Sequence, residues 1–259
     1  MTSQNVVDWS QILILIGLFL IAILYSSVGH GGASGYLAIL SLSTYASMES
    51  GWLKQHVWCL NLIVAAIAFS HYYKAGYYIN KLTIPFIVGS IPFAIIGGYL
   101  KVDGGVYDTL LSITLIWAAY RLYKTKNEDV ENNFTEPDLK IALPTGAGIG
   151  LISGVVGVGG GIFLSPIILL KKWADPKTVA ATSALFIWVN SAAGLFGAGI
   201  SNQLQINFEV LFPFILVVLI GGYIGSKFGS LAHQSSIRLI LIGVLIIASG
   251  KRLFDLFAF

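Results

Sequence analysis

Charged residues and cysteine are scarce in this chain. Asp, Glu, Lys and Arg make up only 10% of its 259 residues, whereas an ordinary soluble domain carries about 25%. Together with a mean hydropathy of +0.81, this scarcity excludes a soluble globular domain. The single cysteine, Cys59, excludes an internal disulfide bond and a metal site built from several cysteines. We therefore expect no metal and no other cofactor, and the small net charge of +3 gives no indication of a nucleic-acid partner.

Long apolar runs are what the chain has instead. Several exceed the roughly 18 residues typical of a membrane-spanning helix, which predicts an all-α integral membrane protein in the lipid bilayer. No Lys or Arg precedes the first run, 11–28, so we expect it to remain as a membrane helix rather than to be cleaved as a signal peptide. The further predicted helices are 34–44, 54–72, 82–100, 105–123, 139–156, 162–170, 177–199, 207–226 and 236–254.

Two glycine-rich breaks interrupt these runs. The first break contains Gly29, Gly31 and Gly32, and the second contains Gly157, Gly159, Gly160 and Gly161. Each glycine disfavours a helix by about 1 kcal/mol relative to alanine. A break inside a membrane leaves backbone N–H and C=O groups unpaired, which is tolerated only where protein or a water-filled cavity surrounds them. A pair of breaks, one in each half, is typical of a transporter binding site.

The two halves of the chain repeat each other at a spacing close to 128 residues. The glycines of the first break align with those of the second, and with a small shift Asn61 aligns with Asn190. The common order of these matches predicts an internal duplication. We expect a first repeat at 1–123, a polar cytoplasmic linker at 124–138 and a second repeat at 139–259.

The lengths of the predicted helices and the positions of the basic residues predict a topology. Segments 34–44 and 162–170 would each span about 15 Å, half of a hydrocarbon core of about 30 Å. We expect each to form a re-entrant hairpin with the helix before it, followed by three crossings. Eleven of the 15 Lys and Arg then fall on one side, which is predicted to be cytoplasmic. The halves would form an inverted repeat in the cell inner (plasma) membrane, with both termini outside. We expect no Lys or Arg deep in the long helices.

The paired Gly-x-Gly-Gly breaks, with Pro166 shortly after the second, resemble those of the TauE/SafE family of sulfite exporter-like membrane permeases. Through the repeat, the resemblance extends over nearly the whole chain. It implies transport of a small sulfur-containing anion, such as sulfite or an organosulfonate. The two copies differ at two positions, because the first has Ala38 where the second has Pro166, and His30 where the second has Val158.

The breaks also suit an anion on physical grounds. A short helix that begins at each break points its N–H groups and the positive end of its dipole toward the membrane centre, and glycine lets an oxyanion reach the backbone. We therefore predict a permease that binds its substrate at the midplane and works by alternating access. The competing interpretation is that the glycines only allow close helix packing. The predicted substrate-binding residues are Gly29, His30, Gly31, Gly32, Ser34, Asn61, Gly157, Gly159, Gly160, Gly161, Ser183 and Asn190.

The polar members of this set have alternative roles. His30 is the only ionisable residue in either break, so it is expected to bind the anion or to carry a coupled proton, H+. Its alternative role is that of a neutral histidine bonded to a backbone carbonyl. Asn61 and Asn190 can donate to an oxyanion or join two helices. Ser34 and Ser183 are candidates too, although buried hydroxyls often bond their own helix.

Other classes of protein fit parts of the sequence. Gly32-Ala33-Ser34-Gly35 reproduces the Gly-x-Ser-Gly of rhomboid intramembrane proteases. Such a serine needs a histidine base within hydrogen-bond reach, and here His56 and Asn61 follow the serine at a spacing unlike the rhomboid one. We therefore expect no enzyme. A passive anion channel lined by the two re-entrant segments is an open alternative, and so is assembly as a homo-oligomer.

Overall fold

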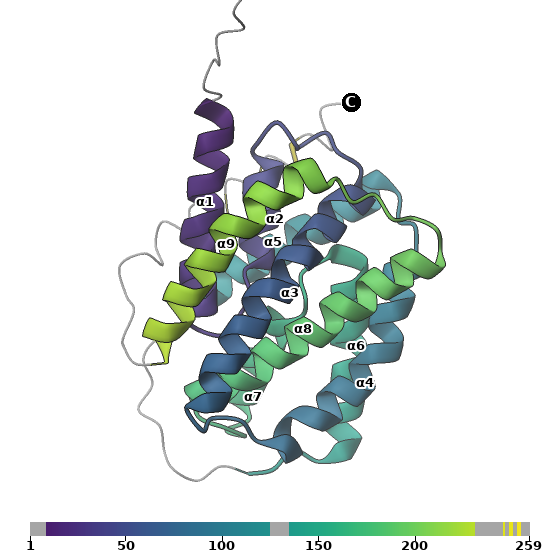
Figure 1. Ribbon diagram of the computed structural model, residues 1–259. Coiled ribbons are helices and arrows are strands. Elements are labelled where there is room, and N and C mark those ends of the chain that lie inside the picture. Colours follow the sequence, from purple (N-terminus) through teal and green to yellow (C-terminus); the bar gives the residue numbers. More distant parts are fainter. Residues whose placement is uncertain (1–8, 125–134, 231–245, 247–248, 251–252, 255–259) are drawn as a thin grey trace, which may run out of the picture.

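The computed structural model describes residues 9–124, 135–230, 246, 249–250 and 253–254, and for Arg121 and Leu122 the backbone alone. These residues form helices joined by loops (Figure 1). Most of the predicted helix 236–254 and of the predicted linker 124–138 lies outside the described residues. The helices are α1 (Trp9–Ser26), α2 (Ala33–Ser41), α3 (Ser50–Lys74), α4 (Asn80–Tyr99), α5 (Gly104–Lys124), α6 (Leu139–Val156), α7 (Gly161–Leu170), α8 (Pro176–Ile200) and α9 (Phe208–Gly229).

The lengths and compositions of these helices confirm the predicted all-α membrane fold. Six of the described helices, α1, α3, α4, α6, α8 and α9, are long and apolar enough to cross a membrane. The two helices that follow the glycine breaks are short, with 9 residues in α2 and 10 in α7. The largest difference from prediction is at the beginning of α3, which starts at Ser50 rather than at residue 54.

Side chains at several helix ends explain where those helices begin. Asp175 precedes α8, and its carboxylate accepts hydrogen bonds from the backbone N–H groups of Lys177 and Thr178. Asp138 and Asn207 cap α6 and α9 in the same way. Such caps satisfy N–H groups that have no partner within the helix.

Small residues let two pairs of helices approach closely. On α6, a methyl group placed at Gly150 would lie 2.4 Å from the backbone oxygen of Ser90 on α4. On α9, one placed at Gly225 would lie 2.1 Å from the backbone oxygen of Ile23 on α1. Close packing through small residues therefore occurs between α4 and α6 and between α1 and α9. It also occurs at the first break, where a methyl group placed at Gly29 would lie 2.1 Å from the backbone oxygen of Ala180 on α8.

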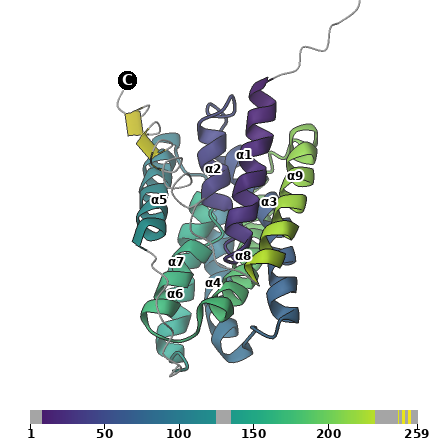
Figure 2. The same ribbon diagram turned by 90° about the vertical axis from the view of Figure 1, so that its left-hand side faces the viewer.

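The helices α3 and α8 cross in the middle of the bundle, in antiparallel directions. Trp58 on α3 lies against Gly194 on α8, and the Asn61 amide nitrogen, one turn further along α3, donates to Ser191 Oγ over 3.3 Å. Around this pair, α9 packs on α1 and α3, while α4 packs on α6 and α8. In Figure 2, α2 turns back toward the beginning of α1, and α7 turns back toward the beginning of α6.

The two ends of the bundle differ in charge. One end, here called the Lys101 end, joins the start of α3 to the end of α4 through Gln203, which donates to Tyr99 O and accepts from Gln55. The opposite end, here called the Lys140 end, joins the loops around α6 and α7, where Thr135 N donates to Lys172 O. Lysines gather at the Lys140 end, which holds Lys74, Lys81, Lys140, Lys171, Lys172, Lys177 and Lys227.

Candidate functional site

The two glycine breaks have the same backbone conformation. Gly29, Gly31 and Gly32 have φ angles of 72°, 72° and 120°. The aligned residues Gly157, Gly159 and Gly160 have φ angles of 93°, 71° and 84°. Left-handed backbone of this kind favours glycine. The glycines are therefore required by the shape of the chain at both breaks.

Both breaks lead to the centre of the α3–α8 crossing. A methyl group placed at Gly31 would lie 3.0 Å from Asn61 Oδ1 and 3.0 Å from Ile187 Cγ2. One placed at Gly159 would lie 2.8 Å from Asn61 Nδ2 and 2.8 Å from the same Ile187 atom. The Asn61 amide is thus next to both breaks, one from each half of the chain. The sequence analysis predicted Gly31, Gly159 and Asn61 but missed Ile187, which no polar or glycine signal marks.

The asparagines at the crossing are buried and only partly hydrogen-bonded. Asn61 and Asn190 are both 0% exposed. Each amide nitrogen has one acceptor, Ser191 Oγ for Asn61 and Phe186 O for Asn190. The Oδ1 atoms of both residues have no hydrogen-bond partner. Buried polar atoms are normally paired, so this centre is suited to a polar guest. The bond from Asn61 to Ser191 also shows the helix-joining role that the sequence left open.

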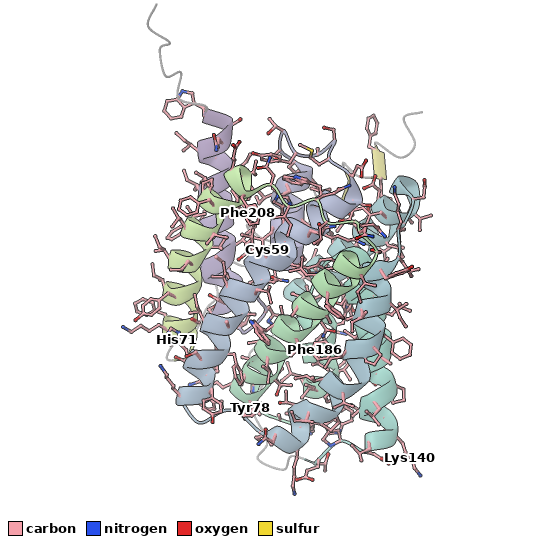
Figure 3. The ribbon with its side chains drawn as sticks, turned by 45° about the vertical axis from the view of Figure 1, so that its right-hand side comes forward. Cys59, His71, Tyr78, Lys140, Phe186 and Phe208 are labelled. Atoms are coloured by element: carbon pink, nitrogen blue, oxygen red, sulfur yellow. The ribbon has the colours of Figure 1, made fainter. Side chains whose placement is uncertain are left out.

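The short helices begin at the breaks without side-chain caps. Gly32 and Gly160 are the N-cap residues of α2 and α7, and neither end has a side-chain cap. Both ends are buried, since Gly32, Ala33, Gly160 and Gly161 are all classed as buried. The first N–H groups of a helix carry partial positive charge and bind anions. Phe186, against which Gly160 packs, lies between Lys140 and Phe208 in Figure 3, which places this break well inside the bundle.

His30 lies beside the crossing rather than in it. It is half-buried, and its Nδ1 lies 2.8 Å from the backbone oxygen of Val28, so that Nδ1 is the protonated nitrogen in this bond. Its ring meets the Tyr25 ring edge to face at 6.5 Å. This is the carbonyl-bonded arrangement described above as one of two possibilities.

The predicted serines face other hydroxyls, with Ser34 in the first turn of α2 and Ser183 in the long helix α8. Ser34 Oγ is 2.8 Å from the hydroxyl of Tyr25. Ser183 Oγ is 2.6 Å from Ser165 Oγ, which in turn donates to Gly161 O. The partner of Ser34 is therefore a tyrosine hydroxyl and not the histidine base that a serine protease needs. Among the remaining predicted glycines, Gly29 meets Ala180 on α8, Gly157 meets Lys54 on α3, and Gly32 meets Tyr36 on α2.

Lys54 lies close to the beginning of a long helix and is nevertheless buried. Because α3 begins at Ser50, this residue lies one turn inside the helix, and only 3% of it is exposed. Its ammonium lies 3.4 Å from the backbone oxygen of Leu100 and 5.5 Å from the centre of the Trp58 ring. The predicted helix 54–72 began at this lysine, and nothing in the sequence marked the residue as buried.

Comparison with known proteins identifies the family. Residues 12–252 match the family described as Sulfite exporter TauE/SafE. The chain is 35% identical to Probable membrane transporter protein y4hK of Sinorhizobium fredii, over 95% of this chain and 99% of the relative. It is 24% identical to Probable membrane transporter protein YdhB of Bacillus subtilis, over 85% and 90% of the two chains. It is 26% identical to Probable membrane transporter protein MJ0441 of Methanocaldococcus jannaschii, over 90% and 91%. No solved structure matches the chain. This protein therefore belongs to the sulfite exporter TauE/SafE family and is a multi-pass membrane transporter.

Proposed function

We propose that this protein carries a small anion across the plasma membrane, and that the anion is a sulfur-containing oxyanion such as sulfite or an organosulfonate. The substrate binds between the two glycine breaks, beside Asn61. Transport proceeds by alternating access, with H+ as the coupling ion and both termini outside the cell. The family supports the transport of sulfite-like anions, and the local chemistry supports the position of the site.

One observation carries this proposal, namely that two buried helix N-termini without side-chain caps begin beside one buried amide. The N–H groups of α2 and α7 provide donors and positive potential. The Asn61 nitrogen carries two hydrogens and has one acceptor, so it supplies a further donor. An oxyanion has several acceptor oxygens and a negative charge, and it matches this set of donors. A cation does not.

The arrangement of the helices supports an inverted repeat. The alignment of the halves exchanges α1 with α6 and α4 with α9. Accordingly, the packing of α9 on α1 corresponds to the packing of α4 on α6. The centre is closed in this conformation, because Asn61 and Asn190 are fully buried. Access from either end then requires the outer helices to move relative to the α3–α8 pair, as in other transporters with inverted repeats.

Transport assays with the purified protein in liposomes test this proposal. Liposomes loaded with unlabelled sulfite should accumulate labelled sulfite from a dilute external solution, because a carrier exchanges one substrate molecule for another. Acetate serves as a control anion that lacks sulfur. An imposed proton gradient should drive net uptake if H+ is coupled.

The outcomes of these assays separate the possible functions. A passive channel would let labelled sulfite equilibrate down its gradient but would not concentrate it by exchange. Equal transport of acetate and sulfite would contradict the preference for sulfur-containing anions. Absence of flux for sulfite, sulfoacetate and thiosulfate alike would overturn the proposed function.

A further inference from the structure

We propose that the face of α3 formed by Lys54, Trp58 and Asn61 is an oxyanion-recognition route that leads from the Lys101 end to the second break. This inference rests on the proposed function, because it assigns the path by which the same anion reaches Asn61. The three residues are separated by four and three positions, so their side chains lie on one face of the helix. Each of them can donate a hydrogen bond.

Lys54 carries a buried positive charge that no carboxylate of the described residues neutralises. Its ammonium has one hydrogen-bond partner, the Leu100 backbone oxygen at 3.4 Å. In the described part of the chain the one ion pair is between Lys81 and Glu136, at the other end of the bundle. A buried charge is costly unless a counter-charge compensates it. Lys54 also lies near the N-terminus of α3, where the helix dipole makes a cation less favourable. A bound anion would relieve both costs.

Trp58 provides an independent sign of a missing ligand. Its side chain is 0% exposed, and its indole Nε1 has no hydrogen-bond acceptor. The same ring lies below the Lys54 ammonium at 5.5 Å, so the charge and the unpaired N–H belong to one local environment. Tryptophan Nε1 can only donate, and a buried donor without an acceptor calls for an explanation. An oxyanion next to Lys54 would supply the acceptor.

The three donors on α3 lie alongside the second break, from Gly157 at its beginning to Gly159 at the centre of the bundle. A methyl group placed at Gly157 would lie 2.6 Å from Lys54 Cβ, and one placed at Gly159 would lie 2.8 Å from Asn61 Nδ2. Between these two levels Trp58 faces Gly194 of α8. An anion moving along this side of the break would meet an ammonium, then an indole N–H, and then an amide.

The aligned face of α8 lacks two of these donors. Adding the 129 residues that separate Asn61 from Asn190 aligns Lys54 with Ser183 and Trp58 with Ile187. Ser183 is bonded to Ser165, and Ile187 is apolar. The two routes to the centre are therefore chemically unequal. We expect a lower half-saturating concentration for an oxyanion offered at the Lys101 end than for one offered at the Lys140 end.

The test measures sulfite transport from each side of oriented vesicles. Lys54→Gln retains a donor for Leu100 O but removes the charge, and Trp58→Phe retains most of the ring but removes the N–H. Each variant should raise the half-saturating sulfite concentration at the Lys101 end by about 10-fold to 150-fold, the range for one hydrogen bond to a charged group. The value at the Lys140 end should stay within about twofold of wild type. Lys54→Arg should retain the low value.

The matched control is Lys101→Gln, which removes an exposed lysine one residue after Leu100 and changes the net charge by the same amount. It should leave sulfite transport unchanged at both ends. If Lys54→Gln and Trp58→Phe fold and transport like wild type from both sides, Lys54 only caps the C-terminus of α4 and the inference is wrong. An equal loss at both ends, accompanied by a lower melting temperature, also contradicts it. Failure of the wild-type protein to transport sulfite or sulfoacetate overturns the proposed function itself, and this inference with it.

Discussion

A single methyl group at Gly159 should weaken sulfite transport without unfolding the protein. Gly159 has φ of 71°, and an alanine in this left-handed conformation costs about 1–2 kcal/mol. The added carbon would lie 2.8 Å from both Asn61 Nδ2 and Ile187 Cγ2, whereas ordinary contacts begin at 3.4 Å. Relieving the overlap requires shifts of about 0.6 Å, and overpacking of this kind costs about 1–3 kcal/mol. The sum, about 2–5 kcal/mol, does not exceed the free energy of unfolding of a typical protein, which is about 5–15 kcal/mol.

The consequence for binding is expected to be larger than this loss of stability suggests. The methyl group pushes the Asn61 amide away from its position between the breaks and fills space that an anion would use. Loss of a hydrogen bond to a charged group costs about 1.5–3 kcal/mol, or about 10-fold to 150-fold in affinity. Gly159→Ala should therefore raise the half-saturating sulfite concentration by at least about 10-fold in liposome uptake. Gly31→Ala should act in the same direction from the other break.

Gly76→Ala is the matched control for backbone strain. Gly76 has φ of 83°, and a methyl group there would meet no atom within 4 Å. It should lower the melting temperature through the same left-handed penalty while leaving sulfite uptake unchanged. If Gly159→Ala transports sulfite with the half-saturation of wild type, then the substrate does not bind at this break. If Gly76→Ala impairs transport to the same extent, the effect is one of strain and not of the site.

Three further predictions address packing, coupling and topology. Gly150→Ala should lower the melting temperature, because its methyl group meets a backbone oxygen at 2.4 Å. Gly148→Ala should raise the melting temperature, because a methyl group there meets no atom within 4 Å and alanine favours a helix by up to about 1 kcal/mol relative to glycine. Equal shifts for the two variants would contradict close α4–α6 packing. His30→Val should fold, and if His30 carries the coupled proton it should keep sulfite exchange but lose uptake driven by a pH gradient; retention of pH-driven uptake would show that His30 does not couple. An impermeant thiol reagent applied to intact cells should label Ser3→Cys but not Asn127→Cys, and labelling of both from one side would exclude the inverted topology.

The class of this protein followed from local properties of the sequence. Apolar runs longer than the thickness of a bilayer require helices whatever they pack against, because a backbone in lipid must pair its own polar groups. The glycine breaks were equally evident, since six glycines at three pairs of aligned positions cannot be ordinary helix interior. The half-length segments after them, α2 and α7, were predicted within a few residues. The beginning of α3 was predicted at residue 54 instead of Ser50, because Ser50 and Gly51 interrupt the apolar pattern in the sequence.

The sequence by itself determined the membrane class and the two breaks. It also predicted the repeat, and it suggested the anion through family resemblance. Only the tertiary structure showed that both breaks reach the same Asn61 amide, that Ile187 lies between them, and that Lys54 and Trp58 are buried beside the second break. The reason is physical. Periodicity and glycine content report interactions along one helix, whereas a binding site depends on which residues from distant helices share a centre. That choice is made by the crossing of α3 and α8, where close contacts between residues more than 100 positions apart decide which donors face the anion.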